Sequence, residues 1–184
     1  SAALGTTSPF EMELAESRAA LGQWAPSATA WRGALSANPN LDQAAAYALA
    51  PAPATARQLV RDVFLAPPVE LGARRALAAL DMSWGAPGDA WAALRDLPPD
   101  SASVDAWVDF GTRAAAEERW ALARDAYVAA ARVRHTAALA LQAAAAALNA
   151  GDAATALALA PATGVDSANA AETVAMTRAA PEAF

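Results

Sequence analysis

The sequence predicts an all-α protein built from about five stacked helix pairs. Sixty of its 184 residues are alanine, the residue with the highest helix propensity. Apolar residues recur at spacings of three and four, the helical period, and no useful length of chain alternates at period two as a strand would. Turn-forming residues interrupt this pattern at regular intervals, which favours helix, turn and helix throughout.

Clusters of proline, glycine and asparagine divide the chain into runs of about 10 to 16 residues. Proline cannot donate a helical hydrogen bond, and glycine favours turns, so we expect each cluster to end a helix. The clusters stand at 23–26, 38–40, 51–53, 67–68, 85–88, 98–100, 149–152 and 161–164. We therefore expect one domain over 1–184, with helix pairs at about 8–41, 42–68, 69–99, 104–135 and 137–161 and a terminal helix at 167–180.

A packing register recurs through these pairs. The second helix of each pair carries a residue, mostly bulky, at steps of 33, 33, 30 and 33: Trp31, Phe64, Leu97, Tyr127 and Ala160. Four residues earlier stand mostly small residues: Ser27, Val60, Ala93, Ala123 and Ala156. The first helices carry the adjacent pairs Leu14-Ala15, Tyr47-Ala48, Leu80-Asp81, Phe110-Gly111 and Ala143-Ala144. A small residue lets two helices approach and the large one fills the remaining space, so we expect these positions in the core.

This register resembles the tetratricopeptide repeat, whose pattern runs W-x2-L-G-x2-Y, then A-x3-F, then P. The resemblance is strongest at 104–135, which supplies Trp107, Phe110, Gly111, Ala114, Ala123, Tyr127 and Ala130, and it extends over nearly the whole chain. Asp81 departs from it, because the family places Gly or Ala in that slot. The resemblance implies a right-handed α-α superhelix, a TPR-like solenoid, in which each pair buries its apolar face against its neighbour.

Composition and charge exclude several classes of function. The net charge of −6 and the pI near 4.7 argue against nucleic-acid binding, which needs a basic surface. The absence of cysteine excludes disulfides and thiolate metal sites. No apolar run reaches the roughly 18 residues of a membrane span. The absence of Lys and Ile is typical of a GC-rich bacterial genome, and a start at Ser1 without a signal-like segment favours a processed or trimmed chain, with the periplasm slightly preferred over the cytoplasm.

Few residues invite a catalytic or metal-binding interpretation. His135, the single histidine, is expected at a helix end, where a cation is mildly favourable. Ser101 and Ser103 suit helix capping. Glu117-Glu118 is the one attractive carboxylate pair for an enzyme, but it is expected in an exposed turn. We therefore predict no enzyme activity, no cofactor and no metal site.

The predicted function is that of a non-catalytic scaffold or adaptor for protein–protein interaction. In the tetratricopeptide family ligands generally lie in a groove lined by the first helices, and this groove would be acidic and free of lysine, so it should prefer a basic or apolar peptide or helix. Trp91 and Trp120 are further candidate anchors. The alternative is a structural subunit or stalk domain of a larger bacterial envelope or secretion assembly. The candidate groove residues are Met12, Glu16, Arg75, Met82, Asp105, Asp109, Thr112, Gln142 and Asn149.

Overall fold

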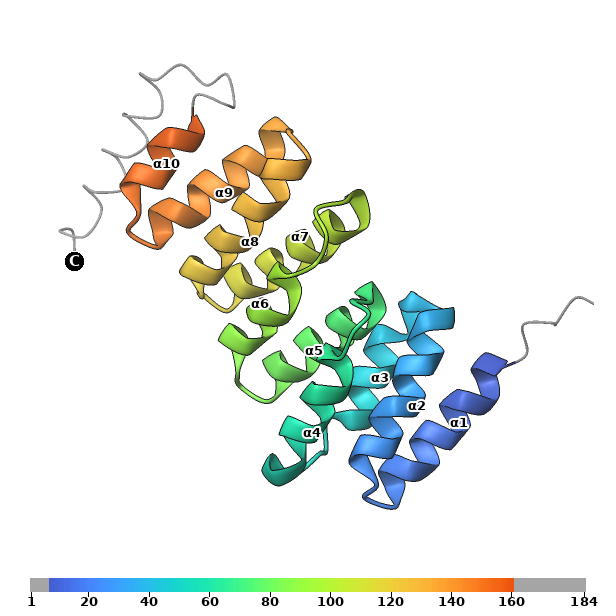
Figure 1. Cartoon of the computed structure of the whole chain (residues 1–184). Coiled ribbons are helices and arrows are strands. Elements are labelled where there is room, and N and C mark those ends of the chain that lie inside the picture. Colours follow the sequence, from blue (N-terminus) through green and yellow to red (C-terminus); the bar gives the residue numbers. More distant parts are fainter. Residues whose placement is uncertain (1–6, 161–184) are drawn as a thin grey trace, which may run out of the picture. The chain divides into compact units, whose positions relative to one another are not determined.

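The computed structural model describes residues 7–160, with side chains from Phe10 onward. This part of the chain is all helical and contains no strand (Figure 1). The predicted helix at 167–180 lies outside the described residues. The elements are α1 (Thr7–Ala20), α2 (Trp24–Ala37), the short 3-10 helix η1 (Pro39–Leu41), α3 (Asp42–Leu49), α4 (Ala54–Leu65), α5 (Leu71–Ser83), α6 (Pro87–Arg95), α7 (Ser101–Ala116), α8 (Trp120–Val133), α9 (Ala137–Asn149) and α10 (Ala153–Leu159).

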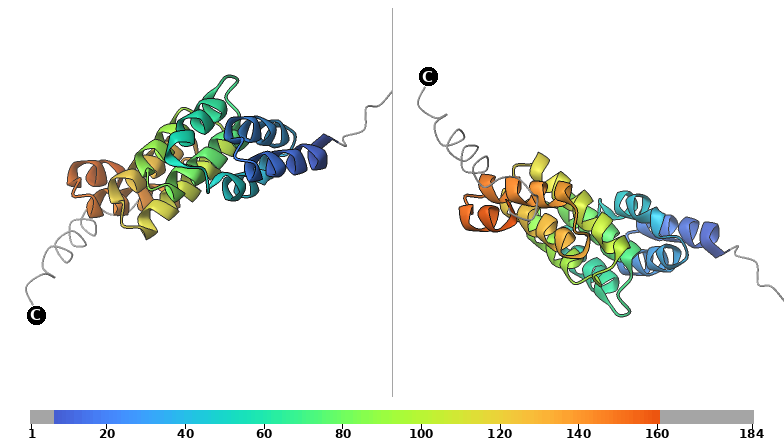
Figure 2. Two further views of the ribbon diagram at one scale, coloured as in Figure 1. Left: turned by 90° about the horizontal axis from the view of Figure 1, so that it is seen from below. Right: turned by 90° about the horizontal axis from the view of Figure 1, so that it is seen from above.

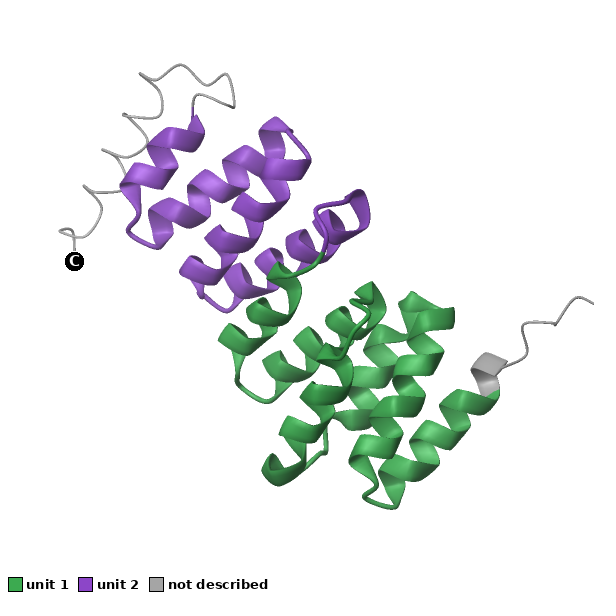
Figure 3. Ribbon diagram, in the orientation of Figure 1, with its two compact units in different colours: residues 1–97 green, residues 98–184 purple. Residues whose placement is uncertain are grey.

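The helices form two compact units, which divide between Leu97 and Pro98 (Figure 3). The first unit holds α1 to α6 and the second holds α7 to α10. Within the first unit α1 packs along α2, and α5 along α6; within the second, α7 packs along α8 and α8 along α9 (Figure 2). Helices α1 and α7 begin before the ranges expected for their pairs, at Thr7 and Ser101.

Four of the helix pairs share one turn. Its central residue has a positive φ, between 57° and 78°, at Gly22, Gly85, Glu118 and Gly151. In each turn that residue donates to the carbonyl three positions earlier, and the next residue donates to the carbonyl five positions earlier, as in Glu118 N to Ala115 O (3.0 Å) and Arg119 N to Ala114 O (2.8 Å). These bonds satisfy the last carbonyls of the first helix and reverse the chain.

The shared turn corrects the predicted register of the third pair. Tyr127 lies nine residues after Glu118 and Trp31 nine after Gly22, so the equivalent residue after Gly85 is Leu94, not Leu97. Leu94 is buried, as are Trp31, Phe64, Leu97 and Tyr127, which were all expected in the core. The 30-residue step therefore falls between Phe64 and Leu94, one pair earlier than the sequence suggested.

The second pair does not use this turn. The chain between α3 and α4 carries Pro51 and Pro53, and α3 packs chiefly on α5 while α4 packs chiefly on α2. Tyr47 was expected to fill a packing slot, but its side chain is 86% exposed. The reason is local: α3 is a helix of eight residues that buries Ala45, Ala46 and Leu49, and Tyr47 points away from that face.

No helix among the described residues is long and apolar enough to cross a membrane.

Candidate partner-binding groove

A hollow of about 470 Å³ opens at one end of the first unit, between α1, the start of α2, and α3 with the turn that follows it. We call it the α1–α3 groove. Three alanines give it a small-residue surface, two aromatic side chains and a proline stand around them, and one carboxylate completes the lining. The lining residues are Glu16, Ala19, Ala20, Trp24, Tyr47, Ala48 and Pro51.

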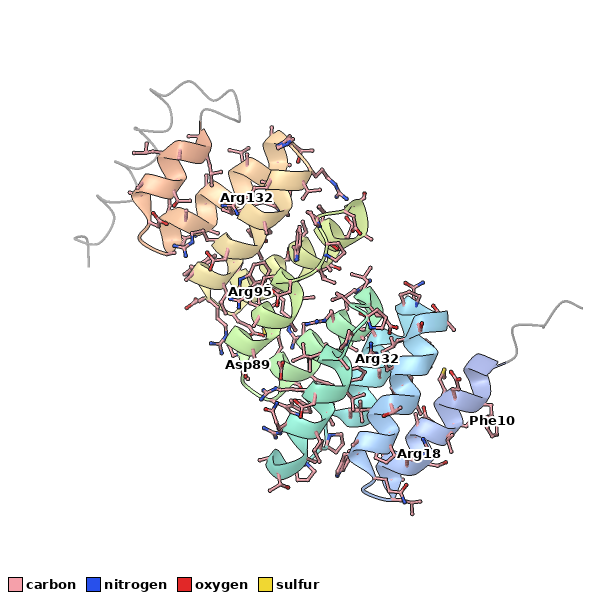
Figure 4. All side chains as sticks on the ribbon, viewed as in Figure 1. Phe10, Arg18, Arg32, Asp89, Arg95 and Arg132 are labelled. Atoms are coloured by element: carbon pink, nitrogen blue, oxygen red, sulfur yellow. The ribbon has the colours of Figure 1, made fainter. Side chains whose placement is uncertain are left out.

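Buried neighbours fix the direction in which the groove residues point. On α1, Ala15 is buried against the first-unit core, and its carbonyl accepts a hydrogen bond from Ser27 Oγ at 2.7 Å. The following residue, Glu16, is exposed and faces the hollow. Near the C-terminal end of α1, Arg18, labelled in Figure 4, donates to the carbonyl of Pro26 at 3.2 Å, which ties α1 to the first turn of α2.

The turn that carries Pro51 is held by Trp84, at the end of α5. The indole Nε1 of Trp84 donates to Ala50 O at 3.0 Å, and Arg57 Nε donates to Ala52 O at 3.3 Å. The guanidinium groups of Arg57 and Arg61 lie over the Trp84 ring, 5.2 and 5.8 Å from its centroid. These cation–π contacts stabilise the Trp84 ring, which in turn holds the turn at Pro51 through its hydrogen bond to Ala50.

Arg61 in turn binds a buried carboxylate. Its Nε donates to Asp81 Oδ1 at 2.7 Å, and its guanidinium also pairs with Asp89 at 3.0 Å. Asp81 is only 1% exposed, and burial raises its pKa to about 6, although the hydrogen bond from Arg61 opposes this shift. Asp81 was expected in a small-residue slot, but in the corrected register that slot, seven residues before the turn residue, belongs to Ala78. The Asp81 carboxylate instead ties α5 to α4.

The predicted groove residues of the first unit occupy different environments. Glu16 lines the α1–α3 groove. Met12 packs, partly buried, against the core, and Arg75 pairs with the buried Asp42 at 3.1 Å. Met82 is 9% exposed and lies in the core, which removes it from any accessible surface. Its prediction was wrong because the third pair is shifted by three residues relative to the assumed register.

The predicted groove residues of the second unit are exposed but do not line a described hollow. Asp105 pairs with Arg134 at 2.8 Å. The hydroxyl of Thr112 donates to Val108 O at 2.9 Å and lies 3.1 Å from the Tyr127 hydroxyl. The remaining three, also exposed, are Asp109, Gln142 and Asn149.

A second hollow, of about 390 Å³, lies in the second unit among α8, α9 and α10. Its walls are mostly apolar, with Arg132 and His135 as the basic groups. His135 follows the C-terminal end of α8, as predicted, and is exposed. Leu159, the last residue of α10, is one of its lining residues.

The other residues singled out in the sequence have structural surroundings. Glu117 pairs with Arg113 and Arg119 in the exposed α7–α8 turn. Asp100, not Ser101 or Ser103, caps α7, and its carboxylate accepts from Ser103 N at 2.8 Å. Trp91 and Trp120 are partly buried. Within residues 7–160 no three His, Cys, Asp or Glu side chains gather as a metal site would require.

Most of the α1–α3 groove was missed by sequence reasoning. Tyr47, Ala48, Trp24 and Pro51 were assigned to packing or to turns, and Ala19 and Ala20 carry no signal of their own. One clue was available: on a short α3 that buries Ala45 and Leu49, Tyr47 falls on the opposite side of the helix.

Comparison with protein-family models, with curated proteins and with solved structures finds no match to this chain. Its function is therefore inferred from the residues and the geometry of the groove.

Proposed function

We propose that this protein is a non-catalytic interaction scaffold that holds a segment of a partner protein in the α1–α3 groove. The observation that carries the proposal is the side chain of Tyr47, which stands 86% exposed beside an apolar hollow. An exposed aromatic residue at the edge of a concave apolar surface is a frequent anchor for a protein partner.

The lining favours a peptide over a small charged ligand. Ala19, Ala20 and Ala48 have short side chains, so a partner backbone can approach the helices closely. Tyr47 and Trp24 supply large contact areas with few rotatable bonds, which limits the entropy lost on binding. Glu16 gives the groove a negative edge in a chain whose net charge is −6, which favours a basic or apolar segment.

We also propose that the helix pairs form a TPR-like right-handed superhelix. The recurrence of one turn at Gly85, Glu118 and Gly151, at equal steps of 33 residues, supports this proposal because equal repeats with equal turns stack by the same rotation. The groove also lies on α1 and α3, which are first helices of their pairs, where the family resemblance places a ligand.

Selection from a displayed random-peptide library, with the full chain as bait, tests the proposed binding. Peptides should be enriched on the wild-type protein and lost on Tyr47→Ala, because that change removes the exposed ring without touching the core. The matched control is Leu59→Ala on α4, which removes another exposed apolar side chain (53% exposed) outside the groove lining. If peptides were enriched equally on the wild type, Tyr47→Ala and Leu59→Ala, or on none of them, the proposal would be wrong.

A further inference from the structure

We infer that the α1–α3 groove takes an extended, proline-rich segment with a basic residue beside its prolines. This inference rests on the proposed function and specifies the partner. It follows from three properties of the groove: the kind of side chains in its walls, its length, and its charge.

The walls suit prolyl rings better than the anchors of a helix. A helix that docks in a groove inserts Leu-, Phe- or Met-sized side chains into apolar pockets. The described residues that line this groove include no aliphatic side chain larger than alanine, and the walls are Trp24, Tyr47 and Pro51. Flat aromatic faces with a shallow surface between them are the usual recognition surface for prolines in the polyproline II conformation.

The length of the groove agrees with a short extended segment. Along α1 the lining runs from Glu16 to Ala20, a rise of about 6 Å at 1.5 Å per residue. A polyproline II segment rises about 3.1 Å per residue, so about two residues cover this distance and a short segment spans the lining. Such a segment is already stiff before it binds, and therefore loses little conformational entropy on a site as open as this one.

The charge at the groove edge selects a cationic neighbour for the prolines. Glu16 lines the groove, and Glu13 lies exposed one turn earlier on α1. Arg18, the cation of the same helix, donates to the Pro26 carbonyl. An arginine in the ligand can pair with the Glu16 carboxylate through two parallel hydrogen bonds.

The test measures the binding of four labelled peptides to the full-length protein by fluorescence anisotropy. The first peptide contains two Pro-Pro pairs and one arginine. In the second every proline is alanine, in the third the arginine is glutamate, and the fourth is an amphipathic helix with leucine anchors and the same net charge as the first. The protein variants are Tyr47→Ala, Tyr47→Phe and Glu16→Arg, with Leu59→Ala as the control.

The proline-rich peptide should bind at least tenfold more tightly than its alanine version and than the helical peptide. Tyr47→Ala should weaken it by about tenfold or more, which is the loss of about 1.4 kcal/mol. Tyr47→Phe, which keeps the ring, should weaken it less than Tyr47→Ala, and Leu59→Ala should bind it like the wild type. Glu16→Arg should lose the arginine peptide and gain the glutamate peptide.

Other outcomes separate the inference from the proposed function. If the helical peptide binds more tightly and depends on Tyr47, the groove is a docking site but the proline-rich assignment is wrong. If the alanine version binds as well as the proline-rich peptide, the assignment is also wrong. If none of the four peptides depends on Tyr47 and the library selection also fails, both proposals fall.

Discussion

At the scale of single residues, the contact between Gly111 and Tyr127 shows how the repeat pattern works. A Cβ atom built on Gly111 would lie 2.9 Å from Tyr127 Cε1 and 3.1 Å from two more ring atoms. The ring is buried and its hydroxyl lies 3.1 Å from Thr112 Oγ1, so it cannot move aside freely. Glycine is therefore required at this position by the approach of α8 to α7.

Gly111→Ala should destabilise the protein by about 1–3 kcal/mol, the usual penalty for overpacking a close contact. The matched control is Gly88→Ala in the first turn of α6, where a Cβ would meet no atom within 4 Å. That change should be neutral or slightly stabilising, because alanine restricts the unfolded chain. Urea unfolding followed by circular dichroism measures both. A Gly111→Ala protein as stable as Gly88→Ala would show that the Tyr127 ring yields easily.

The sequence predicted the packing positions of Gly111 and Tyr127 correctly, but it misassigned Tyr47. The core positions of Gly111 and Tyr127 followed from the repeat pattern, because steric requirements at a close helix contact leave a clear signature. Tyr47 was misassigned because its exposure depends on which face of α3 packs on α5, and α5 lies far along the chain, at Leu71–Ser83. A prediction from spacing alone treats every copy as a regular pair, whereas the proline-bounded α3 is not one.

At the scale of helices, Arg61 of α4 connects three elements of the first unit. It binds Asp81 of α5 at 2.7 Å and Asp89 of α6 at 3.0 Å, and it covers the Trp84 ring. These contacts offset the lack of a shared turn between α3 and α4. The register assumed from the sequence placed Asp81 in a slot that belongs to Ala78, and it could not show that Asp81 binds Arg61, 20 residues away on another helix.

The Asp81 carboxylate should make stability fall as pH rises. The pKa of Asp81 is about 6 in the folded protein and 3.8 in the unfolded chain. The pKa rises on folding mainly because burial disfavours the charged carboxylate. Between these two pH values the folded state binds more protons than the unfolded state, so the free energy of unfolding falls as the pH rises. The stability that the protonated carboxyl of Asp81 contributes is therefore complete below pH 3.8 and is lost as the pH passes through about 6. A difference of about two pKa units corresponds to about 3 kcal/mol.

The measurement compares urea unfolding of the wild type and Asp81→Asn at several pH values. The difference isolates Asp81, because both proteins share every other titrating group, including Asp89. The wild type should lose stability relative to Asp81→Asn as the pH rises from about 4 to about 7. A constant difference would mean that the carboxylate ionises at its ordinary pH. A wild type that gains stability over this range would mean that the ion pair with Arg61 outweighs burial and lowers the pKa of Asp81.

At the scale of the whole molecule, the two units are built from the same kind of helix pair with different filling. The first unit centres on large side chains such as Trp31, Phe64 and Leu77, whereas the buried residues of α9 and α10 are alanines apart from Leu139. Alanine buries little area per residue, so the last pair gains less from burial than the first unit does. The composition predicted this contrast directly, because the alanine run at 143–147 is visible in the sequence.

The proposed superhelix makes a prediction about the dimensions of the molecule in solution. A compact globule of this length has a radius of gyration of about 16 Å, whereas a stack of helix pairs grows along one axis and must exceed that value. Small-angle X-ray scattering should therefore give a larger radius and a distance distribution with a long tail. A concentration series is the control, because a dimer would lengthen the particle only at high concentration. A radius near 16 Å with a symmetric distribution would contradict the superhelix, while leaving the α1–α3 groove intact, since that groove lies within the first unit.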